Sequence, residues 1–333
     1  MLREHGAAAL GPQGFAVDPD HGERAELQRR PGARFRKDEF EHRLEPGGGM
    51  CYLHAVDVAQ RQRPPAGELY LDHLAHFVPD LGAAAAVWEK LGFAVTPISV
   101  HNVSGKPAGT SNRCVMLEDG YLELLAPTAD TPNAQRVRDR MKRFVGVHLA
   151  CFGTPDAAAE HARLGAHGFE PEPVVSLERK IETGESVRFS VVYVSPEKMP
   201  EGRVQYCEHL TPRQVWREGF VNPFRLSAVY VVADDPEEVA ARWGRFGGLL
   251  PRPEDGFVRL DTARGRVVIG TKSSLSKVFG NVPAAPAIAG YALCCSDPEA
   301  FAARCSKAGM KVRGNVVTLP AALGGAWLLE SPA

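Results

Sequence analysis

The sequence lacks the features that mark several common classes of protein. It has no run of about eighteen apolar residues, so we expect no membrane-spanning helix. Its first stretch, MLREHGAAALGPQGF, lacks the long apolar core of a secretory signal. The formal net charge is only -1 at pH 7, which gives no electrostatic basis for binding nucleic acid or an anionic membrane.

The cysteines also exclude some kinds of site. The seven cysteines include no CxxC pair, which argues against a thiolate zinc site. Their number is odd and most lie in apolar runs, which favours buried, reduced thiols over a disulfide framework. We therefore expect a cytoplasmic protein that acts on a small molecule, with a homodimer left open.

The N-terminal part differs in composition from the rest. Between Glu23 and Gly49 the chain is crowded with Arg, Glu, Pro and Gly and has little apolar periodicity. Such a segment buries too little apolar surface to offset its ordering entropy. We predict that residues 1–66 are a mostly disordered extension, with at most a marginal helix from Phe35 to Leu44. Met50 is an alternative start of translation.

From Glu68 onward the sequence repeats itself. The first copy reads LDHLAHFVPDLGAAAAVWEKLGF from Leu71, and the second reads GVHLACFGTPDAAAEHARLGAHGF from Gly146. Each predicts a short strand, then a helix with an aspartate (Asp80, Asp156) at its start and a glycine at its end. Fainter copies begin at Ser227 and Gly290.

Further apolar runs after each helix predict three more strands per copy. Examples are YLELLAP and RVQYCEHL in the first two copies and RVVIG and AWLLE in the last two. Each βαβββ unit leaves one sheet face uncovered, so units must pair. We predict an α+β fold of four βαβββ units in two paired domains, 67–223 and 224–333, with mixed curved sheets and helices outside.

Two residue types recur at matching places of the first two units. His73 and His148 lie on the first strand, and Glu123 and Glu208 lie on the last. Pairing the units would bring these side chains into one four-ligand site. Neutral imidazole and carboxylate suit one divalent ion of Zn, Ni, Mn, Co or Fe(II), with positions left for water or substrate.

The remaining sequence supports this assignment. A lone histidine on a strand is more often structural than a ligand, but a glutamate in an apolar run is costly to bury without compensation. His76 lies three residues after His73, on the opposite strand face, and has Cys151 as its counterpart. The first strands of units three and four contain no histidine, so we expect the second pair to be structural or a lid.

Weaker candidates for substrate binding lie elsewhere. The stretch HNVSGKPAGTSNR (101–113) predicts a flexible loop carrying His101, Thr110 and Asn112, which is either a substrate contact or a plain solvated turn. Arg188 and Arg203 could bind a substrate carboxylate, although exposed arginines usually bind nothing specific.

The chain resembles the vicinal oxygen chelate superfamily, which includes glyoxalase I, methylmalonyl-CoA epimerase, extradiol dioxygenases and resistance proteins. The residues that carry the resemblance are LDHLAHFVPDL, GTSNR, YLELLAP and EHLTPRQVW, which are similar to the glyoxalase-like group. The resemblance covers residues 69–223 well and 225–330 weakly. It implies metal ligands at His73, Glu123, His148 and Glu208.

By this resemblance, a metal would bind adjacent substrate oxygens and stabilise an enediolate or enolate. Glu208 or Glu123 could leave the metal and transfer the proton. We expect a metal-dependent enzyme, an isomerase or lyase acting on an α-oxygenated carbonyl compound. The alternatives are an Fe(II) extradiol-type dioxygenase and a non-catalytic small-molecule-binding protein of the resistance type.

Overall fold

The computed structural model describes residues 57–103 and 105–332. Most of the predicted N-terminal extension, including Met50, lies outside the described residues. The structure differs from the expectation at residues 57–66, where the short helix α1 (Val58–Arg61) contacts the body. Gln62 is fully buried and donates to the carbonyl of Glu118, and Arg61 pairs with Asp119 at 2.8 Å.

The predicted fold class is confirmed, because the order of elements gives four βαβββ units. The first two are β1 (Tyr70–Phe77), α2 (Leu81–Lys90), β2 (Ser99–Val103), β3 (Lys106–Asp119), β4 (Tyr121–Pro127), and β5 (Gly146–Gly153), α4 (Ala157–Ala166), β6 (Val175–Lys180), β7 (Ser186–Tyr193), β8 (Arg203–His209).

The last two units have the same order. They are β9 (Val221–Val232), α6 (Pro236–Gly247), β10 (Arg252–Glu254), β11 (Phe257–Asp261), β12 (Arg266–Gly270), and β13 (Ala287–Cys294), α8 (Pro298–Lys307), β14 (Lys311–Arg313), β15 (Val316–Thr318), β16 (Ala326–Glu330). Three helices connect units: α3 (Pro132–Met141), α5 (Pro212–Val215) and α7 (Lys272–Phe279). Among the described residues, no helix is long and apolar enough to cross a membrane.

Local sequence explains why each unit begins in the same way. Asp80, Asp156, Asp235 and Asp297 each precede the unit's helix and accept a hydrogen bond from a backbone N–H of its first turn. This bond satisfies one of the N–H groups that a helix start leaves without a partner. The repeated Asp therefore fixes the turn from the first strand into the helix.

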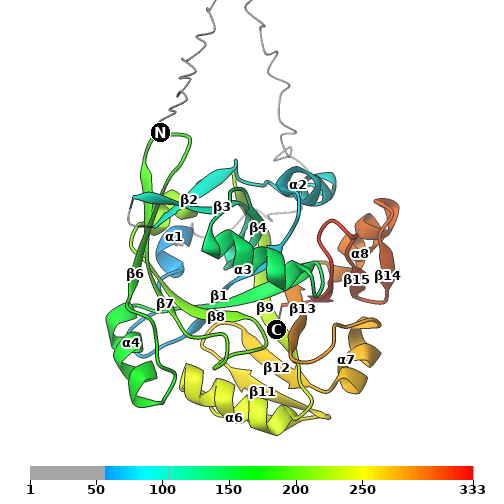
Figure 1. Ribbon diagram of the computed structural model, residues 1–333. Coiled ribbons are helices and arrows are strands. Elements are labelled where there is room, and N and C mark those ends of the chain that lie inside the picture. The colour runs from blue at the N-terminus through cyan, green and yellow to red at the C-terminus, as the bar shows by residue number, and fades with distance from the viewer. Residues whose placement is uncertain (1–56, 104, 333) are drawn as a thin grey trace, which may run out of the picture. The chain divides into compact units, whose positions relative to one another are not determined.

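The first two units close into an eight-stranded barrel. Within each unit the first and last strands are parallel neighbours, and β1 pairs with β5 antiparallel. The ring then runs from β5 through β8, β7, β6, β2, β3 and β4 back to β1. Figure 1 shows these strands curving around a common interior, with α3 lying across β1, β3 and β4. Closure leaves an enclosed inner face.

The last two units make a similar but open sheet joined to the barrel. Strands β9 and β13 pair antiparallel, and β9 also pairs with β3 of the barrel. The inner face of this second sheet packs against α7, where Leu275 and Phe279 are buried against Tyr230 and Val268. The second pair is therefore filled by its own connecting helix.

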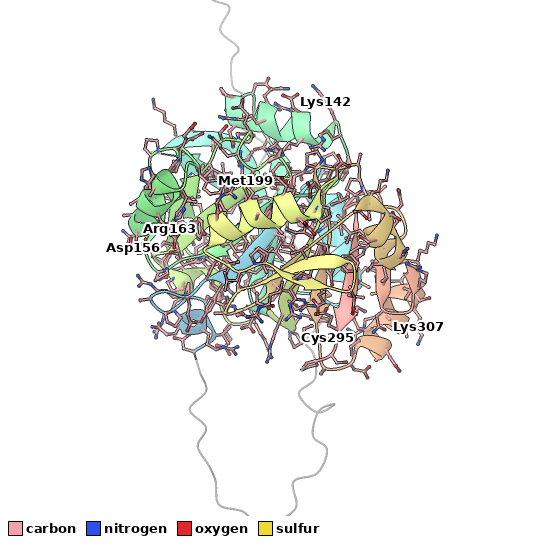
Figure 2. All side chains as sticks on the ribbon, turned by 90° about the horizontal axis from the view of Figure 1, so that it is seen from below. Lys142, Asp156, Arg163, Met199, Cys295 and Lys307 are labelled. Carbon is pink, nitrogen blue, oxygen red and sulfur yellow. The ribbon has the colours of Figure 1, made fainter. Side chains whose placement is uncertain are left out.

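One apolar core joins the two pairs. It lies between the outer sheet faces and the four unit helices, and it includes Trp88, Trp243, Trp327, Phe152 and Phe246. In Figure 2, Asp156 and Arg163 mark α4 at one side of this layer, and Met199 lies beside α6. The inner face of the barrel has a separate apolar cluster, which lines the site described next.

Candidate functional site

The barrel interior contains a cavity of about 580 Å³. Its polar lining comes from both units and from α3 and its cap, and it consists of His73, His101, Asn102, Thr110, Asn112, Tyr121, Glu123, Thr131, Asn133, Arg136, Asp139, Arg140, Glu172, Glu178, Arg179, Tyr193, Arg203, Gln205 and Cys207. Its apolar lining includes Phe77, Leu125, Leu149 and Phe189. A partly apolar pocket with a few convergent polar groups is the usual form of a small-molecule site.

Glu123 is the one buried carboxylate that faces this cavity among the described residues. Asn112 on the neighbouring strand donates its Nδ2 to Glu123 Oε1 at 2.6 Å. Arg179 in turn donates to Asn112 Oδ1 at 3.0 Å, which fixes the orientation of the amide. The second oxygen of Glu123 is left to a group in the cavity.

His101 lies beside Glu123, with its Nε2 3.5 Å from Glu123 Oε1. Its Nδ1 is 3.1 Å from Thr110 Oγ1, and Asn133 donates to the same hydroxyl oxygen. We assign the Thr110 hydroxyl as the donor to Nδ1, which places the ring proton on Nε2. Burial lowers the pKa of His101 to about 4, although the charge of Glu123 raises it, and the charges of Arg179 and Arg203 add to the lowering. The imidazole is therefore neutral near pH 7.

His101, Thr110 and Asn112 were predicted to lie on a flexible loop over 101–113, and the structure differs. Strands β2 and β3 continue through most of this stretch and turn as a hairpin between Val103 and Lys106. These side chains therefore project from barrel strands, and Thr110 and Asn112 are almost fully buried. A strand holds a side chain more firmly than a loop does.

His73 also faces the cavity, stacked on Tyr121 with ring centroids 4.3 Å apart. Its Nδ1 donates to Asp72 Oδ2 at 2.6 Å. His209, which the sequence analysis did not single out, donates its Nε2 to the same carboxylate at 2.9 Å. Burial by itself disfavours both charges, yet His209 and His73 hold the pKa of Asp72 below its usual range, and Asp72 raises the pKa of His209 to about 9.

His148 and Glu208 do not line the cavity, so the four predicted ligands are not brought together. His148 stacks on Phe144 and its Nε2 donates to the Phe144 carbonyl at 2.8 Å. Glu208 Oε2 accepts from the backbone N–H of Ala157 at the start of α4, outside the barrel. This corrects the predicted site, of which only His73 and Glu123 face inward.

Strand register explains the difference. Opposite His73 and Ala75 on β1 stand Cys151 and Leu149 on β5, and the pairing then skips His148. His73 and Leu149 both face the cavity, and each lies seven residues before the capping aspartate of its unit, so Leu149, not His148, is the equivalent of His73. A slip of one residue moves a side chain to the other sheet face.

The last strands of the two units show the same relation. Glu123 lies opposite Ala75, and Gln205 lies opposite Cys151, which is the equivalent of Ala75. Gln205 is thus the structural counterpart of Glu123. The matching letters of YLELL and YCEHL align residues that do not occupy equivalent places.

The predicted set of two histidines and two glutamates is therefore not present in the cavity, where His73 and Glu123 lie with Gln205. The second unit offers Leu149 and Gln205 where the first offers His73 and Glu123. Among the described residues, one group of three potential ligands lies within 4.8 Å of one another: Asp72, His73 and Cys151. In this group Asp72 already accepts hydrogen bonds from His73 and His209.

Of the other candidates, Arg188 is exposed on β7 outside the cavity, whereas Arg203 lines it. The sequence analysis missed Arg179, Gln205 and the Asp72–His209 pair. Arg179 lies two residues after the apolar Leu177, on the same inner face of β6. A charged residue at this spacing from apolar ones was the sequence signal that could have indicated an inward arginine.

Comparisons with known proteins agree with the fold. The family described as glyoxalase-like domain matches residues 71–247, which is more than half of the chain. A hypothetical protein from Staphylococcus aureus aligns over 79% of this chain and 99% of its own, with 14% identity and a TM-score of 0.54. A 4-hydroxymandelate synthase mutant from Streptomyces coelicolor aligns over 80% and 94%, with 12% identity and a TM-score of 0.53. No curated protein matches the sequence.

Proposed function

The chain belongs to the glyoxalase-like domain family of the vicinal oxygen chelate superfamily, and we propose that it is an enzyme that moves a proton next to the carbonyl group of a small carboxylate compound. The observation that carries the proposal is the buried pair of Glu123 and neutral His101 inside the barrel cavity. A carboxylate base beside a neutral imidazole donor suits the formation of an enolate.

The mechanism assigns a role to each side chain of this wall. Glu123 takes the proton from the carbon next to the carbonyl, the C–H electron pair forms a carbon–carbon double bond, and the π pair of the carbonyl moves onto its oxygen. His101 donates its Nε2 proton in a hydrogen bond to that oxygen, which becomes negative. In an α-hydroxy carbonyl compound, Glu123 then delivers the proton to the former carbonyl carbon while the hydroxyl proton moves between the two oxygens, which completes an isomerisation. Donors already in place stabilise such charge without reorganisation.

Arg179 supports both binding and catalysis in this scheme. Its side chain is only 9% exposed, and among the described residues it forms no ion pair with an acid. A buried guanidinium without a counter-ion is costly. A substrate carboxylate would supply the missing charge and place the neighbouring carbon near Glu123. Asn112, held between Arg179 and Glu123, acts as a positioning residue.

The test is exchange of substrate hydrogen for deuterium, followed by proton NMR in D2O. The panel consists of small 2-oxo and 2-hydroxy acids, with and without prior dialysis against a metal chelator. We expect at least one acid to exchange faster than in buffer, at a rate that chelation does not change. Loss of exchange on chelation, restored by a divalent ion, would support the metal-dependent alternative.

The two non-isomerase alternatives give different results in the same panel. A small-molecule-binding protein raises its melting temperature with an acid but exchanges no hydrogen. A dioxygenase consumes oxygen, and a sealed electrode measures that directly. Either result, obtained without exchange, would contradict the proposed proton transfer.

A further inference from the structure

The cavity contains more positive charge than one substrate carboxylate would balance. Four arginines line it, Arg136, Arg140, Arg179 and Arg203, and none of them pairs with an acid within 4.0 Å among the described residues. Three of the four acids in the lining, Asp139, Glu172 and Glu178, are exposed at its rim. Glu123 is therefore the single inward carboxylate facing this set.

Arg140 and Arg203 are neighbours of like charge. Arg140 is half-buried on α3, and Arg203 is half-buried at the start of β8. The pKa of the Arg140 guanidinium is lowered by burial and by the charges of Arg203 and Arg143. Because both guanidiniums line the same cavity and like charges repel each other, an anion between them would be stabilised.

The two arginines are held in place by their surroundings. Arg203 donates to Asn133 Oδ1 at 3.0 Å and lies over the ring of Tyr193, 5.6 Å from its centroid. Asn133 lies in the first turn of α3, whose cap Thr131 donates to the carbonyl of Ala108 on β3. The start of α3 is thus tied to the barrel wall, which fixes the helix that carries Arg140.

This pair is separate from the Arg179 position. Arg179 projects from β6 and is anchored by Asn112, whereas Arg203 and Arg140 come from β8 and α3 and are anchored through Asn133. The cavity of about 580 Å³ has room for a molecule that reaches both.

We propose that Arg140 and Arg203 form a second oxyanion subsite, so that the substrate of this cavity is a small dianion. One carboxylate binds Arg179 beside Glu123, and a second carboxylate or phosphate-type group binds between Arg140 and Arg203. The inference rests on the proposed function for the position of the reacting carbon, but the selectivity for dianions follows from the arginines themselves.

The experiment compares the binding of three probes by calorimetry. These are 2-oxobutyrate with one carboxylate, 2-oxoglutarate with two, and phosphonopyruvate with a carboxylate and a phosphonate. We expect the better dianion to bind wild type at least about tenfold more tightly than 2-oxobutyrate, as an added charge-assisted pair would give. Tighter binding of 2-oxoglutarate would indicate a carboxylate at the second subsite, and tighter binding of phosphonopyruvate would indicate a phosphate-type group.

Substitutions of single arginines test which side chains cause the preference for dianions. R140Q and R203Q should each reduce the preference for the dianion about fivefold or more, whereas the exposed control R188Q should leave it as in wild type. R179Q should weaken all three probes. If R203Q does not fold, R140Q decides, because its side chain forms no hydrogen bond with a described residue.

The inference is overturned if the three probes bind alike, or if R140Q and R188Q change the preference equally. A dianion preference without hydrogen exchange would retain the subsite and overturn the proposed proton transfer. Hydrogen exchange confined to monocarboxylates would retain the proposed proton transfer and overturn the dianion subsite.

Discussion

At the residue scale, Asp72 shows how the barrel accommodates a buried charge. Its carboxylate is fully enclosed and accepts from His73 on one side and His209 on the other. Both pKa shifts favour the charged pair of Asp72 and His209. The pair holds His73 through Nδ1 and so fixes the ring face that meets the cavity.

This arrangement predicts how stability depends on pH. The pKa of His209 is raised to about 9 in the folded protein, so its contribution is complete below its unfolded value and is lost as pH rises through about 9. The pKa of Asp72 is lowered, so its contribution is lost as pH falls below the unfolded value. We expect the free energy of unfolding to decrease between pH 7 and pH 10 by on the order of 1–3 kcal/mol.

Urea unfolding at several pH values measures this, with H209Q as the matched variant. H209Q should be less stable than wild type at pH 7 by about 3 kcal/mol, since it leaves Asp72 with one partner. The free energy of unfolding of H209Q should also decrease much less above pH 7 than that of wild type. An equal decrease in both proteins would contradict the assignment of the charge to His209.

At the element scale, the register of β5 and β8 decides which side chains enter the cavity. The equivalent places of His73 and Glu123 in the second unit are Leu149 and Gln205. The account therefore predicts that L149H/Q205E, unlike wild type, assembles four inward ligands. We expect bound zinc to rise from under about 0.1 to about one ion per chain, as for a four-coordinate site.

Elemental analysis after gel filtration measures the metal content of the two proteins. The control is H148A/E208Q, which removes the two residues that the repeat predicted and should leave the metal content of wild type unchanged. A folded L149H/Q205E protein that binds no more zinc than wild type would show that the register assignment is wrong.

The repeat predicted the fold well and the site only in part. Strand, capping aspartate and helix recur in the sequence because each unit needs the same turn, so four units could be counted without a structure. Which face a side chain enters depends on pairing across strands. The skipped residue at His148 has no signature in HLACF, and the matching pentapeptides therefore misaligned the ligands.

The stretch from His101 to Arg113 differs from its prediction because of tertiary packing. Its glycines predicted a loop, but Gly105 forms the hairpin turn and Gly109 has φ +78° within β3. A Cβ on Gly109 would lie 2.2 Å from Thr131 Oγ1, so this glycine permits the close approach of α3 to β3. Tertiary packing, which local sequence does not record, decided its role.

At the scale of the whole molecule, the proposed site lies in the barrel of the first two units. Both pairs of units share one outer core, in which Trp88 contacts Trp327 across the pairs with ring centroids 4.8 Å apart. His76 turns away from the cavity and bonds Leu323 and Tyr291 of the second pair. The second pair therefore supports the barrel wall that carries His73, while α7 fills its own inner face.

In the proposed mechanism Glu123, rather than the full set of repeated ligands, carries the chemistry. The most direct measurement is the rate of hydrogen exchange of the best substrate in E123Q and in E208Q, two variants that each neutralise one repeated glutamate. We predict that E123Q lowers the rate by about 100-fold or more, as loss of a general base does, and that E208Q stays within about twofold of wild type. Equal losses in both variants would contradict the account, because they would place Glu208 at the site with Glu123.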